Sequence, residues 1–137
     1  MVVNQILEQI QNEIIDSGKD IRYKPQAYAF VLNGLEFFIA KLSEKRHVTG
    51  QELSMGLADF AARQYGPLAL TVLNNWGIYT TQDFGYIVYN LINISLLSKR
   101  PQDSVDDFEN VFNLKEFFDT RECFPVDKEF IRTLRGA

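Results

Sequence analysis

Residues 28–42, YAFVLNGLEFFIAKL, contain the most regular hydrophobic pattern in the chain. Apolar side chains recur at i, i+3, i+4, i+7, i+10, i+11 and i+14, which is the spacing of one face of an α-helix. The residues on this face are Tyr28, Val31, Leu32, Leu35, Phe38, Ile39 and Leu42. Pro25 is suited to the first turn of such a helix. We therefore expect a helix from Pro25 to about residue 42, with this face in the core and a neighbour packed closely at Gly34.

Helix signals continue on both sides of this segment. Residues 3–16 form an amphipathic pattern that Ser17-Gly18 ends. Further helices are expected near 50–65, 67–76 and 82–97, with short helical segments from residue 105 and from Leu114. No segment predicts a strand, so the expected fold class is all-α, a single compact bundle of five or six helices over residues 1–119. Residues 120–137 are expected to form a C-terminal tail, either a short helix or partly disordered.

Two capping boxes define helix starts. In Thr49-Gly50-Gln51-Glu52, the threonine hydroxyl and the glutamate carboxylate can each accept a hydrogen bond from an otherwise unpaired backbone N–H. Thr80-Thr81-Gln82-Asp83 repeats the arrangement. Gly77 is expected to end the helix that precedes the second box.

Composition narrows the class of protein. The 137 residues include one cysteine and one histidine, which excludes an internal disulfide framework and any site that needs two imidazoles. A pI near 5.0 and a net charge of −4 argue against coating nucleic acid or an acidic membrane. The first residues lack a basic signal-peptide region, and no stretch offers about 20 apolar residues for a membrane span. We expect a cytoplasmic protein with no membrane partner.

Charge is unevenly distributed along the chain. Residues 64–98 contain one charged side chain, Asp83, whereas residues 101–122 contain seven acids and two bases. The uncharged stretch carries aromatic side chains that form a candidate interaction surface, namely Trp76, Tyr79, Tyr86 and Tyr89. The alternative is that most of these rings belong to the core. We expect Trp76 and Tyr86 to be the exposed ones.

Residues 67–97 have the helix, tight turn and helix order of a helix-turn-helix, followed by a segment in the place of a wing. The second helix contains no lysine or arginine, and the wing position, 101–112, is acidic. Only Lys99 and Arg100 are basic nearby, so charge disfavours nucleic acid. A degenerate winged-helix regulator using Lys99, Arg100 and the basic tail is the alternative function.

His47 is the only candidate general base at neutral pH. With Arg46 and Gln51 it lies at a predicted helix N-terminus, where an anion or a partner could be contacted; a surface or structural histidine is the alternative. The acids Asp103, Asp106, Asp107 and Glu109 lack the pattern of a calcium loop. We expect no catalytic residue, no metal and no cofactor.

Three motifs carry a resemblance to a known family: AYAFVLNGL (27–35), RHVTGQEL (46–53) and GPLALTVLNNWGIYTTQDFGYIVYNLI (66–92). The chain resembles a family of short bacterial conserved hypothetical proteins over residues 23–118. The resemblance implies a single domain with no assigned activity and transfers no functional residue. The sequence departs from it at Asn93-Ile94-Ser95, where a helix-ending glycine is expected.

These observations favour a non-enzymatic interaction module or small subunit of an assembly. Its expected partner is another protein or a second copy of the chain. Three features support this interpretation. The sequence lacks pairs of catalytic residues, its centre is aromatic and uncharged, and the acidic segment beside that centre suits a basic partner.

Overall fold

The computed structural model describes residues 2–42 and 48–123, with side chains for residues 5–42 and 48–119. This part of the chain is helical and contains no strand, which confirms the all-α prediction. Its elements are α1 (Val2–Ile10), the π-helical turn η1 (Gln11–Ile15), α2 (Pro25–Ala40), α3 (Gly50–Tyr65), the 3₁₀ turn η2 (Gly66–Leu68), α4 (Ala69–Asn75), α5 (Thr81–Asn93), the 3₁₀ turn η3 (Val105–Phe108) and α6 (Leu114–Cys123). Helix α6 continues past residue 119, where the tail was expected to begin.

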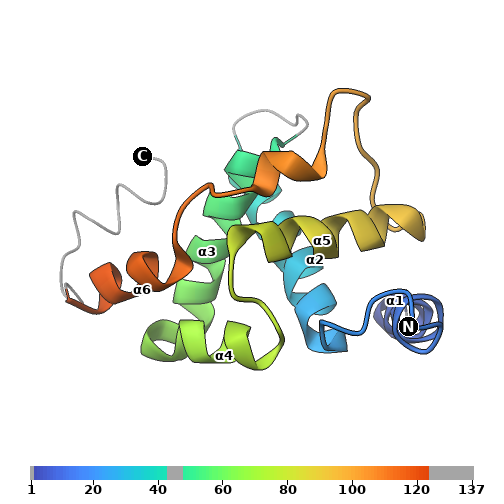
Figure 1. Ribbon diagram of the computed structural model, residues 1–137, viewed down its shortest axis with the longest axis horizontal. Coiled ribbons are helices and arrows are strands. Elements are labelled where there is room, and N and C mark those ends of the chain that lie inside the picture. The colour runs from blue at the N-terminus through green and yellow to red at the C-terminus, as the bar shows by residue number, and fades with distance from the viewer. Residues whose placement is uncertain (1, 43–47, 124–137) are drawn as a thin grey trace.

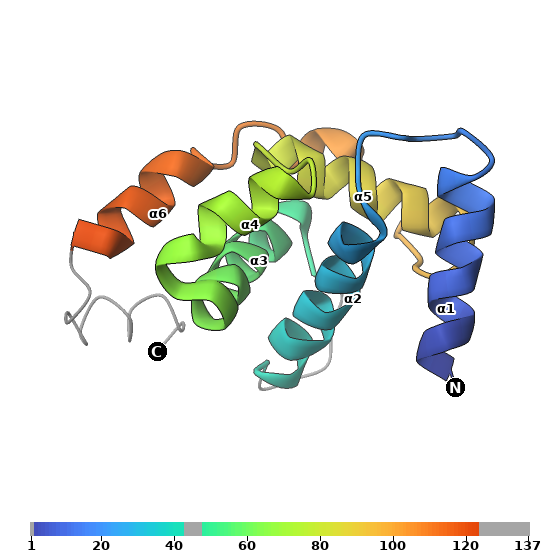
Figure 2. The same cartoon turned by 90° about the horizontal axis from the view of Figure 1, so that it is seen from below.

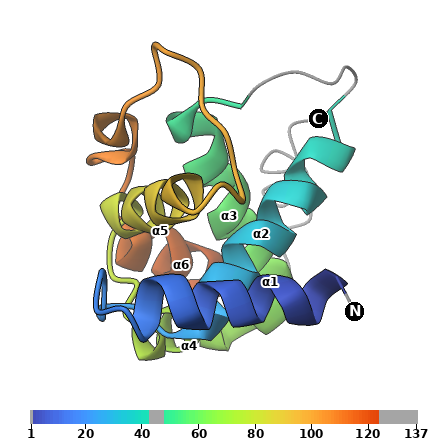
Figure 3. The same ribbon diagram turned by 90° about the vertical axis from the view of Figure 1, so that its right-hand side faces the viewer.

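Helices α2, α3 and α5 form the centre of the bundle (Figure 1). Helices α1 and α6 lie at opposite ends of the molecule, with α4 packed beside α3 and α6 (Figure 2). Helix α1 covers the flank formed by α2 and α5 (Figure 3), and Gln9 there donates a hydrogen bond of 2.8 Å to the carbonyl of Ile94. None of the helices in residues 2–42 and 48–123 combines the length and apolarity needed to cross a bilayer.

Two glycines let α2 and α3 approach closely. A methyl group on Gly34 would lie 2.5 Å from Cδ2 of Leu57, and one on Gly56 would lie 2.6 Å from Cδ1 of Phe38. The close neighbour predicted at Gly34 is therefore confirmed. Tyr28 and Val31 of the predicted apolar face are fully buried, whereas the same face further along α2 is half-buried.

The predicted capping boxes are confirmed. At the start of α3, the Glu52 backbone N–H donates to Oγ1 of Thr49 (3.1 Å), and the Thr49 N–H donates to Oε1 of Glu52 (3.1 Å). At the start of α5, Asp83 and Thr80 make the same pair of bonds, at 3.4 and 3.0 Å. The boxes fix where α3 and α5 begin and hence how each enters the bundle.

Helix α5 ends at Asn93, so the prediction of a helix to residue 97 was wrong. Ser95 adopts a left-handed conformation (φ 65°), which takes the place of the expected glycine. The Leu96 N–H donates to the carbonyl of Leu91 and the Ser95 N–H to that of Ile92, both at 3.0 Å. These two bonds form a Schellman motif, which turns the chain away from α5. The turn directs residues 96–108 back over the bundle.

Candidate functional site

A pocket of about 220 Å³ opens where α2, α3 and α5 meet the segment 97–108. This segment runs along the top of the ribbon in Figure 1. Its walls are apolar and comprise Leu35, Ile39, Val48, Leu53, Val88, Ile92, Leu97 and Phe108. Its polar lining residues come mainly from the C-terminal part of α5 and the following segment, and are Tyr89, Ser98, Lys99, Asp103, Ser104 and Asp107. The pocket therefore combines an apolar interior with polar groups concentrated on one side.

The turn η3, which contributes Asp107 and Phe108 to the pocket, packs closely on two glycines. A methyl group on Gly85 would lie 2.8 Å from Cβ of Phe108, and one on Gly50 would lie 2.7 Å from Cβ of Asp107. The buried Thr81 hydroxyl donates to the carbonyl of Phe108 (2.8 Å) and accepts from the N–H of Val111 (3.2 Å). Small residues and this pair of hydrogen bonds thus hold η3 directly on α5 and α3.

The hydroxyl of Tyr89 is the most unusual polar group of the pocket. Its oxygen is buried and has no hydrogen-bond partner among the residues that the structure describes. Burial raises the pKa of Tyr89, and the negative charges of Asp103 and Asp107 raise it further. The group therefore stays a neutral phenol at physiological pH, able to donate one hydrogen bond and to accept others. A buried hydroxyl without a partner costs free energy, so a hydrogen-bonding group brought within its reach would stabilise the protein.

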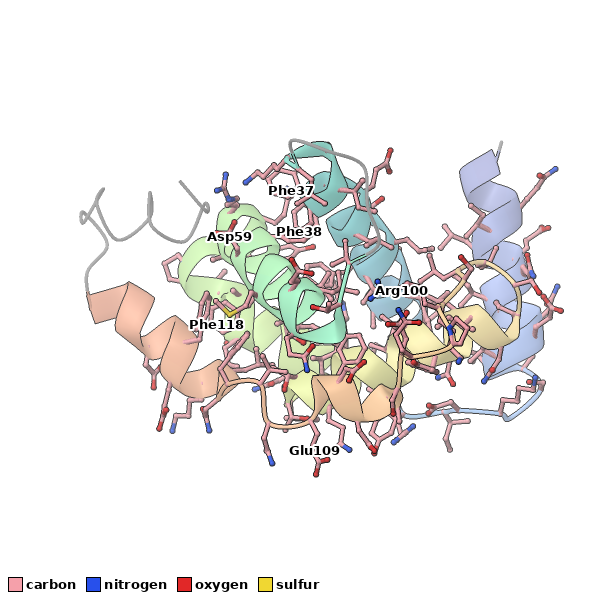
Figure 4. The ribbon with its side chains drawn as sticks, turned by 90° about the horizontal axis from the view of Figure 1, so that it is seen from above. Phe37, Phe38, Asp59, Arg100, Glu109 and Phe118 are labelled. Atoms are coloured by element: carbon pink, nitrogen blue, oxygen red, sulfur yellow. The ribbon has the colours of Figure 1, made fainter. Side chains whose placement is uncertain are left out.

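The charged groups around the pocket differ in the hydrogen bonds and ion pairs that they form within the chain. Asp103 accepts a hydrogen bond from the backbone N–H of Arg100 (2.8 Å) and forms an ion pair with its Nη2 (3.4 Å). Asp107 caps η3 by accepting the N–H of Ser104 (3.1 Å). Lys99 is exposed to solvent. In Figure 4 the Glu109 side chain projects away from the molecule. The Arg100 side chain is 40% exposed.

The structure brings together residues that the sequence assigned to different hypotheses. Tyr89, predicted as an interaction residue, and Lys99, predicted as a nucleic-acid contact, line the same pocket. Arg100 is held by Asp103 at its edge. Gln51 is exposed in the first turn of α3. Arg46 and His47 lie outside the described residues.

The remaining aromatic candidates lie elsewhere. Tyr79 is 62% exposed, whereas Trp76 and Tyr86 are half-buried, so the prediction that those two are the exposed rings was wrong. Trp76 packs on Phe30 (ring centroids 5.7 Å apart), and Tyr86 lies beneath the guanidinium of Arg22 (4.3 Å). Sequence spacing could not show this because Arg22 and Phe30 lie far from these rings in the chain.

Sequence reasoning also missed a buried polar network around Asp20. Its carboxylate accepts hydrogen bonds from Arg22 Nη2 (2.7 Å) and Asn90 Nδ2 (2.9 Å), and the same Asn90 amide donates to the hydroxyl of Tyr28 (3.0 Å). Burial alone would raise the pKa of Asp20, but these hydrogen bonds outweigh it, and the pKa lies below its usual 3.8. Burial raises the pKa of Tyr28 to about 12. The network connects the segment that precedes α2 with helix α5, so its role is structural.

Among the described residues, no group of three or more histidine, cysteine, aspartate and glutamate side chains is placed to hold a metal ion. Comparison with protein-family models, with characterised proteins and with solved structures found no match. The resemblance to the bacterial conserved hypothetical family therefore stays a prediction, and the candidate site depends on its geometry alone.

Proposed function

We propose that this chain is a non-enzymatic, cytoplasmic interaction module that receives one apolar side chain of a partner protein, flanked by a basic residue, in the pocket beside Tyr89. The observation that carries the proposal is the buried Tyr89 hydroxyl, which has no partner in the described structure and lies against an apolar cavity. When the Tyr89 side chain turns its hydroxyl toward the cavity, a backbone carbonyl or amide of the partner completes its hydrogen bonding.

The size of the pocket favours a side chain over a cofactor. Sites for small molecules usually enclose about 300–1,000 Å³. The pocket encloses about 220 Å³, which is closer to the requirement of one large apolar residue. Its apolar walls would gain about 25 cal/mol for each Å² of apolar surface removed from water, so a leucine or phenylalanine of the partner would supply most of the affinity.

The charges beside the pocket favour a basic neighbour of that side chain. Residues 101–109 carry four acids and no base. Arg100 compensates Asp103, and Lys99 adds one positive charge at the pocket, but the four acids leave residues 99–109 with a net charge of −2. Asp106 and Glu109 are exposed. Charge complementarity of this kind speeds association and selects among partners more than it adds affinity.

The winged-helix alternative gains no support from the geometry. The segment predicted as a wing forms the turn η3, which packs on α5 and α3. A recognition helix must present an open face to the major groove. Within α5 only Asn93 is exposed, and the other residues are buried or half-buried.

The test begins with a random heptapeptide library displayed on phage and selected on the full chain. We expect enriched sequences to share a large apolar residue next to lysine or arginine. A synthetic peptide of the enriched sequence is then titrated against the wild type and two variants. Leu97→Phe narrows the pocket, and Met55→Phe is the matched control because Met55 is 44% exposed on α3 and lies outside the pocket.

The proposal expects Leu97→Phe to weaken binding at least tenfold and Met55→Phe to leave it unchanged. Tyr89→Phe should weaken it about fivefold, through the loss of one hydrogen bond. Circular dichroism checks that each variant is folded. Absence of any enriched motif, or equal affinity of all variants, would overturn the proposed function.

A further inference from the structure

A second hollow lies at the opposite end of the α2–α3 pair. It encloses about 240 Å³ and combines residues from the first half of α2, the last half of α3 and the end of α4. Its lining residues are Gln26, Ala29, Phe30, Asn33, Phe60, Gln64, Tyr65 and Trp76. None of them lines the pocket beside Tyr89. We refer to these eight residues as the aromatic groove.

The rings of the aromatic groove form one connected cluster. Tyr65 and Trp76 meet edge to face, with centroids 5.8 Å apart and planes at 83°. Phe30 contacts both, with centroids at 6.5 and 5.7 Å, and also contacts Phe60 at 5.5 Å. Phe30 and Phe60 are buried, whereas Tyr65 and Trp76 are half-buried and supply aromatic surface to the hollow.

The polar lining of the groove is uncharged. Gln26, Asn33 and Gln64 are all exposed, and each side chain offers an NH₂ donor and a carbonyl acceptor. No acid or base is among the lining residues. This lining matches a neutral ligand, and a ligand rich in acceptors can use the NH₂ donors of all three amides.

We propose that the aromatic groove binds a proline-rich segment of a partner protein in the polyproline II conformation. Proline has no backbone N–H, so such a segment presents carbonyl acceptors almost alone. Its backbone forms no internal hydrogen bonds, so these carbonyls are free to accept from the three amides. The pyrrolidine rings pack against Tyr65 and Trp76, and the preformed helix loses little conformational entropy on binding. This inference is independent of the function proposed for the other pocket, because the two sites share no residue.

Trp76 is the only tryptophan of the chain, so its fluorescence reports directly on the groove. The probe is an acetylated, amidated decaproline peptide titrated into the full-length protein. A Gly-Ser peptide of equal length is the control for nonspecific effects. Decaproline is expected to produce a saturable change in Trp76 emission, and the Gly-Ser peptide is expected to produce none.

Variants locate the binding site. Gln64→Ala and Asn33→Ala each remove one exposed amide of the groove and should weaken decaproline binding about fivefold. Gln51→Ala is the matched control, because Gln51 is exposed on the same helix as Gln64 but does not line the groove. It should bind as the wild type does.

Two outcomes would overturn the inference. The first is an absence of saturable emission change with decaproline, and the second is equal affinity of all three variants. If decaproline gives no response, a titration with maltose tests whether the groove binds a neutral sugar instead. Failure of the peptide selection at the Tyr89 pocket would leave these measurements unaffected, so the two proposals are tested separately.

Discussion

Tyr89→Phe tests the reasoning about the pocket most directly, because it removes the hydroxyl and keeps the ring. A buried polar group without a hydrogen bond costs about 1–3 kcal/mol. The ring of Tyr89 is half-buried, so the lower end of that range applies. We expect the free energy of unfolding to rise by about 1 kcal/mol in the variant. Such a gain is unusual, because most substitutions at partly buried positions destabilise.

Urea and thermal unfolding, followed by circular dichroism, measure this effect. For a chain of 137 residues, a gain of about 1 kcal/mol corresponds to a rise in melting temperature of about 3–4 °C. Tyr79→Phe is the matched control, since Tyr79 is 62% exposed. Its hydroxyl is open to water, and we expect a change within about 0.5 kcal/mol.

A loss of stability of about 1 kcal/mol or more in Tyr89→Phe would refute the argument, because it would show that the hydroxyl is hydrogen-bonded in the free protein. The expected result for Tyr89→Phe is a gain in stability together with weaker binding of the selected peptide. It would show that the chain keeps an unsatisfied hydroxyl for a ligand, at the expense of its own stability.

Three further predictions concern the turn after α5, the packing of η3 and the Asp20 network. Ser95→Gly should raise the free energy of unfolding by about 0.5–1 kcal/mol, because glycine adopts the left-handed conformation of Ser95 (φ 65°) without steric cost. Urea unfolding measures this change, and a loss of stability would contradict the prediction. Gly85→Ala should lower the free energy of unfolding by about 1–3 kcal/mol despite the higher helix propensity of alanine, because the new methyl group collides with Phe108. An unchanged free energy of unfolding would contradict this and would mean that η3 moves to make room for the methyl group. Asp20 has a pKa below its unfolded-state value, so its carboxylate stabilises the fold above about pH 4, and that stability is lost as the pH falls through the lowered pKa. Asp20→Asn should therefore cost about 2 kcal/mol at pH 7 and much less at pH 2, and an equal cost at both values would contradict the assignment.

Part of the candidate site could be predicted from the sequence. The sequence predicts contact roles for Tyr89, Lys99 and Arg100, and all three lie in or beside the pocket. These three residues belong to separate hypotheses in the sequence analysis. The reason is that spacing along the sequence shows which residues share a helix face, but it does not show which helices and turns meet in the fold. The end of α5 shows the same limit, since the left-handed Ser95 has no glycine to signal it.

The sequence by itself determined the helices and their starts, because helical periodicity and capping boxes depend on residues within a few positions of one another. The sequence alone therefore predicts the two capping threonines and the apolar face of α2. Only the tertiary structure decided which aromatic rings are covered and where the polar groups gather. Tyr86 is covered by Arg22 and Trp76 by Phe30, and η3 rests on Gly50 and Gly85. The first two contacts join residues 64 and 46 positions apart, and the third joins η3 to two different helices. Such long-range packing is set by the shape of the whole core.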